Sequence, residues 1–266
     1  MPPSYPIVCG SFAGRASQVG VRVHNAAYRA LGLNYIYVAF SIQDIRAAIA
    51  AMRALSLRGC AVTMPFKEAV VPLLDHLDPD AAAIAAVNTI VNDDGILTGY
   101  NTDWLAAKQA LAEVTALEGK VVAVLGAGGA GRAVCYALAR AGCKVHVFNR
   151  TMARAEELAA AFGLAGAHPP ADLPALTDCA ILVNATSVGY LDPDSSPIPD
   201  DWLRSDWVVM DIVPEPLETR LLRAARARGA RTVPGWRMRL LQAAAQFRLY
   251  TGLEPPLDVM QAALLA

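Results

Sequence analysis

The sequence predicts an α/β protein of two domains. Short apolar runs alternate with helix-length segments along the chain, and this alternation predicts parallel sheets covered by helices on both faces. The pattern ends near residue 101 and restarts at Val121, so the chain divides into two such blocks. The runs Val121–Leu125 and Val208–Met210 are continuously apolar, as expected for strands buried on both faces.

Each predicted strand is a short apolar run, and each predicted helix has apolar residues at helical spacing. In the first block the expected strands are Ile7–Gly10, Tyr35–Phe40, Gly59–Met64, Thr89–Asn92 and Leu97–Tyr100, with helices at Gln43–Leu55 and Phe66–His76. In the second block the expected strands are Val121–Gly126, Lys144–Asn149, Ile181–Asn184 and Trp207–Ile212, with a helix at Ala130–Ala141. The tail, Arg237–Ala266, is expected to be helical without another strand.

Composition excludes several classes of function. The chain has 266 residues, of which 55% are hydrophobic, and a net charge of −1, so it offers a sizeable core but no basic face for nucleic acid. No apolar stretch reaches the ~18 residues that would span a bilayer. The five cysteines form no Cys-x-x-Cys pair, and the four histidines lack metal-ligand spacing. We therefore expect a cytoplasmic protein that binds no membrane, nucleic acid or metal.

A glycine-rich segment follows the first strand of the second block. It comprises Gly126, Ala127, Gly128, Gly129, Ala130 and Gly131, and it opens the predicted helix. Strand, glycine-rich turn and helix in this order are the context of a dinucleotide-binding fingerprint, in which the helix N-terminus faces the pyrophosphate. Glycine-rich turns also occur for purely steric reasons, but here the second strand of the unit is also in place.

The tip of that second strand indicates which dinucleotide is bound. An NAD site usually has a carboxylate there, whereas this chain has Asn149, Arg150, Thr151 and, further on, Arg154. Guanidinium groups can hold a 2′-phosphate through forked hydrogen bonds. Asn149 and Thr151 are also good helix caps, and Arg150 in isolation is as typical of a solvated surface. The position of Arg150 at the strand tip favours NADP (NADPH) as the cofactor.

Two further segments carry groups suited to carbonyl reduction. Lys67 begins a predicted helix after the third strand, and Asp103 follows the fifth. A lysine ammonium can donate a proton to a developing alkoxide while a carboxylate orients it. Taken alone, Lys67 is more typical of an exposed helix lysine and Asp103 of a helix cap.

The combination of motifs resembles the shikimate dehydrogenase family along nearly the whole chain. The family's V-T-x-P-F-K, V-N-T and N-T-D segments are matched by Val62 to Lys67, Val87 to Thr89 and Asn101 to Asp103. Its cofactor motifs G-A-G-G-A and N-R-T-x-x-R are matched from Gly126 and Asn149. Its N-A-T-S-x-G and late G-x-x-M…Q segments are matched by Asn184 to Gly189 and by Gly235, Met238 and Gln242.

The resemblance implies a fold, a reaction and residue roles. The family reduces 3-dehydroshikimate to shikimate reversibly with NADPH, and Lys67 and Asp103 would be the catalytic pair. Contacts to substrate hydroxyls would come from Thr63, Asn88 and Gln242. The nicotinamide would be lined by Thr186, Ile212, Gly235 and Met238. The resemblance implies an N-terminal α/β substrate domain completed by C-terminal helices, 1–101 plus 237–266, and a Rossmann NADP-binding domain, 102–236.

The sequence departs from the family at positions that hold substrate. The serines of the family's S-x-S loop fall at Gln18 and Gly20, the Asn of N-V-T at Ala61, and the Tyr of D-x-x-Y at Pro214. Nearby Ser11, Arg15 and Ser17 are candidate replacement anchors for the substrate carboxylate, although an arginine at this position is more typical of an ordinary loop residue. The catalytic pair and the cofactor turn are intact. These departures resemble the shikimate dehydrogenase-like subgroup and predict the same chemistry on an altered substrate pocket.

Several alternatives stay open. Quinate or aminoshikimate is an alternative substrate, although NAD-dependent quinate enzymes tend to have an acidic residue near the strand tip and none lies between Asn149 and Ala155. A non-catalytic NADPH-binding regulator is another alternative, but it would not need Lys67 and Asp103. A folate dehydrogenase would lack the N-A-T-S-x-G segment and Gln242. A homodimer is a further alternative that the sequence leaves open.

Overall fold

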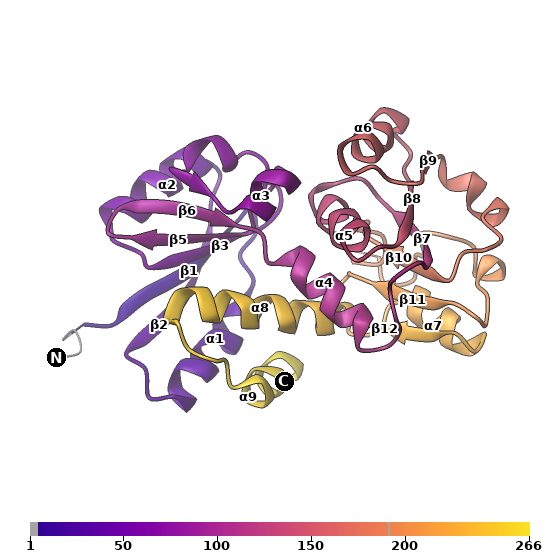
Figure 1. The fold of residues 1–266 in the computed structure, drawn as a ribbon. Helices are drawn as coiled ribbons and strands as arrows, with labels where there is room; N and C mark the ends of the chain where they lie inside the picture. Colours follow the sequence, from indigo (N-terminus) through magenta and orange to yellow (C-terminus); the bar gives the residue numbers. More distant parts are fainter. Residues whose placement is uncertain (1–4, 191) are drawn as a thin grey trace. The chain divides into compact units, whose positions relative to one another are not determined.

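The computed structural model describes residues 5–190 and 192–266 and divides into two compact units. The first unit contains the described residues up to Thr102 together with Gln242–Ala266, and the second contains Asp103–Leu241. The second division falls within helix α8, Gly235–Thr251. Figure 1 labels the α-helices and most of the strands of both units.

The first unit is built on a mixed sheet. Among the described residues this sheet has the strand order β2-β1-β3-β5-β6-β4. Its strands are β1 Ile7–Ala13, β2 Tyr35–Ser41, β3 Gly59–Val62, β4 His76–Leu77, β5 Thr89–Asp93 and β6 Ile96–Tyr100. Its other elements are α1 Gln18–Ala30, α2 Ile45–Ala54, η1 Val71–Leu73, α3 Pro79–Ile84 and α9 Leu257–Leu265.

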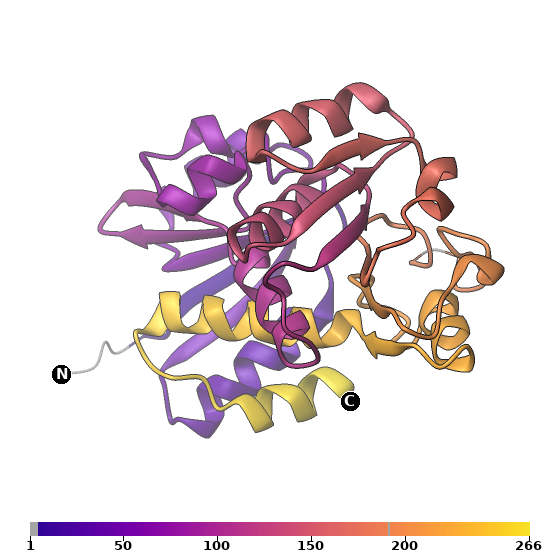
Figure 2. The ribbon, with the colours of Figure 1, turned by 45° about the vertical axis from the view of Figure 1, so that its right-hand side comes forward.

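Helices cover both faces of this sheet. In Figure 1, α2 and α3 lie on one side, and α1, α9 and the later part of α8 lie on the other. Cys60 and Val62 of β3 pack into the core cluster that α2 supplies. Gly59 lies on the opposite face of β3. A Cβ placed on Gly59 would lie 2.2 Å from the ring of Tyr250 in α8. In both ribbon views α9 runs beside α1 (Figure 2).

The expectation of a wholly parallel sheet is wrong for the first unit. β5 pairs antiparallel with both β3 and β6. The pairing of β5 with β6 has a local cause, because only Asp94 and Gly95 separate the two strands, and both have positive φ angles, 52° and 93°. An Asp-Gly pair in this conformation makes the tight turn of a β-hairpin, and a hairpin joins antiparallel strands.

The predicted helix at Phe66–His76 is also wrong. The segment forms turns and the short 3₁₀ helix η1, and His76 already belongs to β4. Pro72 explains the difference, because proline has no N–H to donate within a helix and disfavours helical geometry in the residue before it. Asp75 then ties the segment to β6, since its carboxylate accepts the Leu97 N–H at 2.7 Å.

The second unit has the parallel sheet that the sequence predicts. All its pairings are parallel, in the order β12-β11-β10-β7-β8-β9 across the described residues. Its strands are β7 Val121–Leu125, β8 Lys144–Phe148, β9 Gly166–His168, β10 Ile181–Asn184, β11 Val208–Asp211 and β12 Arg231–Val233. Its other elements are α4 Asp103–Ala112, α5 Gly129–Arg140, α6 Met152–Phe162, α7 Arg220–Ala227, η2 Pro170–Ala175 and η3 Asp200–Trp202.

The apolar run of β7 is buried on both faces, as predicted. Val122 and Val124 belong to one core cluster, whereas Ala123 and Leu125 belong to another on the opposite face. Because successive strand residues alternate between faces, only a sheet covered twice can bury the whole run. The predicted helices at 43–55 and 130–141 are confirmed as α2 and α5, and the tail is confirmed as helical by α8 and α9.

Candidate active site

The turn after β3 carries Thr63 and Lys67 and lies beside the start of β5. The Lys67 carbonyl accepts the Val87 N–H at 2.8 Å, and the Val62 N–H donates to the Asn88 carbonyl at 2.8 Å. These two bonds bring Thr63, Lys67 and Asn88 together at one end of the first sheet. Thr63 is exposed and Lys67 is half-buried, so both side chains are accessible from solvent.

Asn88 is the centre of a buried polar network. Its Oδ1 accepts from the Thr102 N–H and from Thr89 Oγ1, both at 2.8 Å, and its Nδ2 donates to Thr102 Oγ1 at 3.0 Å. Gln246 of α8 joins this network, since its Nε2 donates to the Asn88 carbonyl at 3.2 Å and to Thr89 Oγ1 at 2.9 Å. Asn88 is therefore held in one orientation by residues from three segments of the chain.

Gln242, the glutamine that the sequence singles out, lies one helical turn before Gln246. Residues four apart share a helix face, so Gln242 lies on the face of α8 that meets the Asn88 network. Gln242 is half-buried, whereas Gln246 is 2% exposed. Sequence reasoning missed Gln246, although two glutamines at a spacing of four in an otherwise apolar segment were a usable signal.

Asp103 follows directly after Thr102 and is the first residue of α4. It is buried, with 6% of its surface exposed. Lys67 belongs to the first unit, and Asp103 is the first residue of the second.

The glycine-rich turn of the second unit needs two of its glycines for the fold itself. Gly126 has a φ of 105°, which disfavours any other residue, and its N–H donates to the Phe148 carbonyl at 2.8 Å. A Cβ on Gly131 would lie 2.2 Å from the Gly126 carbonyl oxygen. A Cβ on Gly128, in contrast, would meet no described atom within 4 Å. The space in front of Gly128 is therefore open.

The N-terminus of α5 faces that space without a side-chain cap among the described residues. Its N-cap residue is Gly128, which has no side chain, and Gly129 and Ala130 form the first turn. Unpaired N–H groups and the positive end of the helix dipole make such a terminus suited to a phosphate group. Ala127 belongs to the same turn and is buried.

The tip of β8 is tied to this turn by Asn149. Its Oδ1 accepts the Ala127 N–H at 3.3 Å, and its Nδ2 donates to the Thr151 carbonyl at 2.9 Å. Thr151 is the N-cap residue of α6, although its side chain makes no capping bond. Arg150 is exposed on this loop and Arg154 is exposed in the first turn of α6, where guanidinium groups can reach an anion.

The carboxyl ends of β10 and β11 form the other side of this region. Thr186 follows β10, and its Oγ1 donates to Asn184 Oδ1 at 2.7 Å. A Cβ on Gly126 would lie 3.0 Å from Thr186 Cγ2, so Thr186 packs against the glycine-rich turn. A Cβ on Gly235 would lie 2.2 Å from the Val213 carbonyl, which places Gly235 against the segment after β11.

Ile212 and Met238 lie in apolar surroundings beside these strand ends. Ile212 is half-buried and packs on the core cluster of the second unit, of which Met238 is a buried member. Packing alone accounts for both side chains. The second unit thus brings Gly126, Thr186 and the segment around Ile212 to the carboxyl edge of its sheet, where parallel sheets bind nucleotides.

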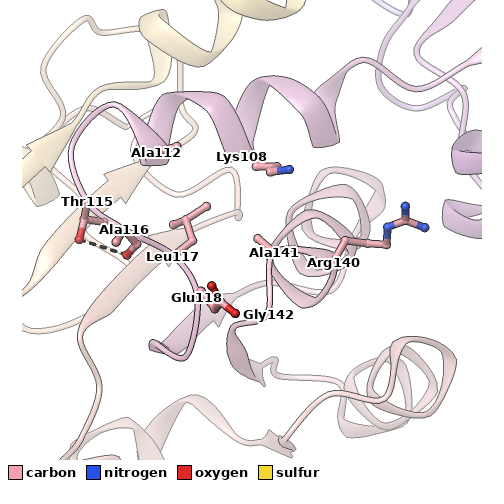
Figure 3. Close-up of a pocket in the computed structure, with 9 residues that line it drawn as sticks. All are labelled: Lys108, Ala112, Thr115, Ala116, Leu117, Glu118, Arg140, Ala141 and Gly142. Carbon is pink, nitrogen blue, oxygen red and sulfur yellow. Dashed lines mark hydrogen bonds between the residues drawn. The ribbon is translucent and has the colours of Figure 1, made fainter.

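A pocket of about 530 Å³ lies at the opposite edge of the second unit (Figure 3). Its lining residues are Lys108, Ala112, Thr115, Ala116, Leu117, Glu118, Arg140, Ala141 and Gly142. Leu117 and Glu118 precede β7, and Ala141 and Gly142 precede β8, so the pocket is at the amino ends of these strands. It is therefore separate from the glycine-rich turn.

Three family models match the chain in succession. They are described as shikimate dehydrogenase substrate binding domain, at residues 17–90, shikimate / quinate 5-dehydrogenase, at 107–190, and shikimate 5′-dehydrogenase C-terminal domain, at 235–265. A curated relative, the shikimate dehydrogenase (NADP(+)) of Moorella thermoacetica, is 47% identical over 255 residues, which cover 91% of this chain and 86% of that protein. The chain belongs to the shikimate dehydrogenase family.

Other members of the shikimate dehydrogenase family agree in sequence and fold. The shikimate dehydrogenase-like protein of Haemophilus influenzae is 41% identical over 252 residues, covering 93% of this chain and 92% of that protein. The crystal structure of a Thermus thermophilus shikimate 5-dehydrogenase in complex with NADP(H) and shikimate has a TM-score of 0.89. It is 39% identical and covers 97% of this chain and 98% of that one.

The residues that depart from the family's substrate positions are spread over both units. Gln18 is the exposed first residue of α1. Gly20 lies against the ring of Tyr37, because a Cβ added to Gly20 would lie 3.4 Å from that ring. Ala61 pairs with Ser11 on one side and Thr89 on the other. Pro214 is half-buried in the segment after β11.

Of the three replacement anchors, Ser17 already has a structural task. Its Oγ caps α1 by accepting the Val19 N–H at 3.3 Å. Arg15 is exposed on the loop between β1 and α1, and Ser11 is half-buried in β1.

Within residues 5–190 and 192–266, no three His, Cys, Asp or Glu side chains gather as a metal site would require. In the same ranges, no helix has the length and apolar character to cross a membrane.

Proposed function

We propose that this chain is an NADP-dependent oxidoreductase that interconverts 3-dehydroshikimate and shikimate, or a closely related hydroxylated ring acid. The observation that carries the proposal is its 47% identity to a shikimate dehydrogenase (NADP(+)) across 91% of the chain. The cluster of Thr63, Lys67 and Asn88 in the first unit supports it.

The second unit fits NADP through its backbone and its charges. The open space at Gly128 and the uncapped N-terminus of α5 suit the pyrophosphate, and Arg150 and Arg154 suit the 2′-phosphate. When bound, the cofactor supplies or removes the hydride. We propose 102–236 as the NADP-binding domain and 1–101 plus 237–266 as the substrate-binding domain.

Lys67 and Asp103 would manage the proton of the same reaction. As a carbonyl becomes an alkoxide, the Lys67 ammonium can donate a proton to the oxygen, and the Asp103 carboxylate can orient that ammonium. Thr63, Asn88 and Gln242 would hold the ring hydroxyls. The buried network around Asn88 supports this role because it fixes the side chain before substrate arrives.

A second candidate substrate is another hydroxylated ring acid, such as quinate or aminoshikimate. The substitutions at Gln18, Gly20, Ala61 and Pro214 favour it, because they remove hydroxyl, amide and phenol groups that would contact shikimate. A lost hydrogen bond that leaves a partner unpaired costs about 1–3 kcal/mol. Several such losses would lower the efficiency with shikimate by orders of magnitude.

Initial rates with shikimate and quinate, each with NADP and with NAD, test the proposal directly. We expect NADP-dependent oxidation of shikimate, followed as the absorbance of reduced nicotinamide. Turnover of quinate alone would select the second substrate. NADPH binding without turnover of any ring acid would contradict an enzymatic role and favour a regulator.

We also propose a pathway, a cellular location and an assembly for the protein. Reduction of 3-dehydroshikimate would place the chain in aromatic amino acid biosynthesis. The five cysteines are free thiols, as expected in the reducing cytoplasm. A homodimer is proposed as the assembly to test by light scattering of the purified protein.

A further inference from the structure

Asp211 ends β11 and is fully buried at the carboxyl edge of the second sheet. Its Oδ1 accepts from Asn184 Nδ2 at 2.9 Å and from the Val213 N–H at 3.1 Å. Its Oδ2 accepts from Thr219 Oγ1 at 2.6 Å. Burial raises the pKa of this carboxyl to about 6, and the same three hydrogen bonds oppose that rise. Burying an acid is costly to the fold, and these hydrogen bonds offset part of that cost.

The three partners of Asp211 connect it to the groups proposed to line the nicotinamide. Asn184 is its neighbour in register on β10, and Asn184 Oδ1 accepts both the N–H and the hydroxyl of Thr186, at 3.0 and 2.7 Å. The bond to Val213 fixes the backbone directly after Ile212. A Cβ on Gly235 would lie 2.8 Å from the Asp211 carbonyl oxygen, so this backbone also borders Gly235.

Thr219 connects the same carboxylate to helix α7. Its hydroxyl donates to Asp211 and also accepts the Leu222 N–H at 3.4 Å, so it caps the helix. A Cβ on Gly189, the last residue of the N-A-T-S-x-G segment, would contact Thr219 Cγ2 at 3.7 Å. Thr219 therefore lies between the buried carboxylate and the loop that follows Thr186.

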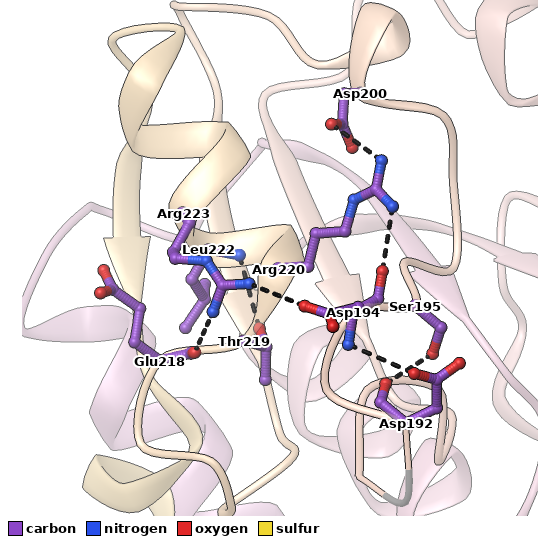
Figure 4. A network of polar contacts seen from close by, with 9 residues as sticks. All are labelled: Asp192, Asp194, Ser195, Asp200, Glu218, Thr219, Arg220, Leu222 and Arg223. Carbon is purple, nitrogen blue, oxygen red and sulfur yellow. Dashed lines mark hydrogen bonds and ion pairs between the residues drawn. The ribbon is translucent and has the colours of Figure 1, made fainter.

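The first turn of α7 also holds that loop from the outside (Figure 4). Arg220 donates to the Asp194 carbonyl at 2.9 Å and to the Asp200 carboxylate at 3.2 Å. Arg223 lies 3.7 Å from the Asp194 carboxylate and donates to the Glu218 carbonyl at 3.0 Å. These exposed pairs are individually weak, so the buried bonds of Thr219 are the stronger part of the connection.

We propose that Asp211 and Thr219 are positioning residues for the nicotinamide end of the cofactor site. Asp211 joins the ends of β10 and β11 and, through Thr219, the start of α7, so Thr186, Ile212 and Gly235 keep one arrangement. The proposal rests on the proposed function, because it takes NADP(H) as the ligand and these three residues as its neighbours.

A carboxylate suits this position better than an amide does. All three partners of Asp211 are donors, and an ionised carboxylate accepts from all of them at once. An asparagine would keep its oxygen for Asn184 and Val213 but would turn an N–H towards Thr219. The Thr219 hydroxyl would then have to accept from residue 211 and would lose its role as a donor there. Asp211→Asn therefore breaks one connection while it nearly preserves volume and packing.

The test compares two ligands on the purified full chain. NADPH contacts both ends of the site, whereas adenosine 2′,5′-bisphosphate lacks the nicotinamide. For Asp211→Asn we expect the Kd of NADPH to rise about tenfold and that of the bisphosphate to change less than about twofold. Asp201→Asn, which changes an exposed aspartate of the same unit, should alter neither Kd.

Variants of Thr219 separate positioning from general destabilisation. Thr219→Val removes the hydroxyl and should weaken NADPH about fivefold, whereas Thr219→Ser retains it and should bind within about twofold of the original chain. An unchanged NADPH Kd in both Asp211→Asn and Thr219→Val would overturn the proposal. Equal weakening of the two ligands would also overturn it, since that outcome indicates only a disturbed fold.

The binding test is independent of the ring acid. If the unmodified chain binds NADPH but oxidises no ring acid, the proposed reaction fails while the positioning proposal is still decided by the two Kd values. If the unmodified chain binds no NADPH, both fail.

Discussion

At the scale of single residues, the three glycines Gly126, Gly128 and Gly131 of one turn differ in whether the fold itself requires glycine. Gly126 needs its positive φ, and Gly131 needs the absence of a Cβ, because a Cβ would lie 2.2 Å from a carbonyl oxygen. Gly128 has neither demand in the folded chain. Its φ of −86° is one that any residue adopts, so the backbone conformation does not require glycine there, whereas the pyrophosphate of the proposed cofactor would.

This difference predicts opposite results for two alanine variants. Gly128→Ala should raise the Kd of NADPH about tenfold or more. It should leave the thermal midpoint unchanged, because the new methyl group occupies only the space proposed for the pyrophosphate. Gly131→Ala should lower the thermal midpoint, because backbone atoms must move. Fluorescence titration with NADPH and thermal unfolding of both variants measure this. Tight NADPH binding by Gly128→Ala would contradict the placement of the pyrophosphate.

Lys67 is predicted to act on the reaction and not on the cofactor. Lys67→Ala should reduce kcat by about 10²- to 10⁴-fold, because a positioned acid is lost, and should leave the Kd of NADPH nearly unchanged. Lys120→Ala, which alters an exposed lysine of the second unit, is the matched control. An active Lys67→Ala variant would refute the assigned role.

At the scale of elements, α8 supplies Gln246 to the polar network around Asn88, which is proposed to hold the substrate. Gln246→Leu would remove the donor that Thr89 Oγ1 accepts from, while the Asn88 carbonyl would keep only its bond from the Val62 N–H. A buried acceptor without a partner costs about 1–3 kcal/mol, so the KM for the ring acid should rise about tenfold. The Kd of NADPH should stay constant, because the bonds broken belong to the first unit.

Steady-state kinetics with a parallel NADPH titration measure this split between KM and cofactor affinity. Arg248→Gln changes an exposed residue of the same helix and should leave KM unchanged. A Gln246→Leu variant with unchanged KM would show that Asn88 needs no support from α8.

The elements also show where local patterns succeed and fail. The apolar period predicted α2, α5 and every strand of the second unit except β9 and β12, which are short edge strands of three residues each. The pattern failed at Phe66–His76, where Pro72 overrides apolar spacing. It also missed the Asp94-Gly95 turn, which makes β5 and β6 antiparallel.

At the scale of the whole molecule, the burial of His24 makes the free energy of unfolding depend on pH. His24 is fully buried, stacks on Tyr37 with ring centroids 4.3 Å apart, and has its pKa lowered to about 4 by burial. The unfolded chain binds a proton at this residue near pH 6.5, whereas the folded chain does so only near pH 4. As pH falls through this window the unfolded state binds more protons, so stability is lost.

His24→Gln should remove this loss. Between pH 7 and pH 5 the difference in unfolding free energy between the original chain and the variant should shift by about 2 kcal/mol in favour of the variant. Asp211, whose raised pKa acts in the opposite direction, is present in both proteins and cancels in the comparison. Urea unfolding at the two pH values measures the shift, and His76→Gln, at an exposed histidine, is the control.

The sequence by itself determined the α/β class, the two blocks, the wholly parallel second sheet and the position of the glycine-rich turn. Each of these follows from residues close together in the chain, whose period, chirality or missing side chain acts locally. The family motifs likewise named Lys67, Asn88 and Arg150 from short segments.

Only the tertiary structure decided which distant polar groups meet. Gln246 reaches Asn88 across 158 residues of chain, and Asp211 joins Asn184 to Thr219 across three separate elements. Such contacts depend on how helices and strands pack, and the sequence around one partner does not specify which distant residue it meets. The residues that hold the site in place were therefore harder to find than those proposed to carry out its chemistry.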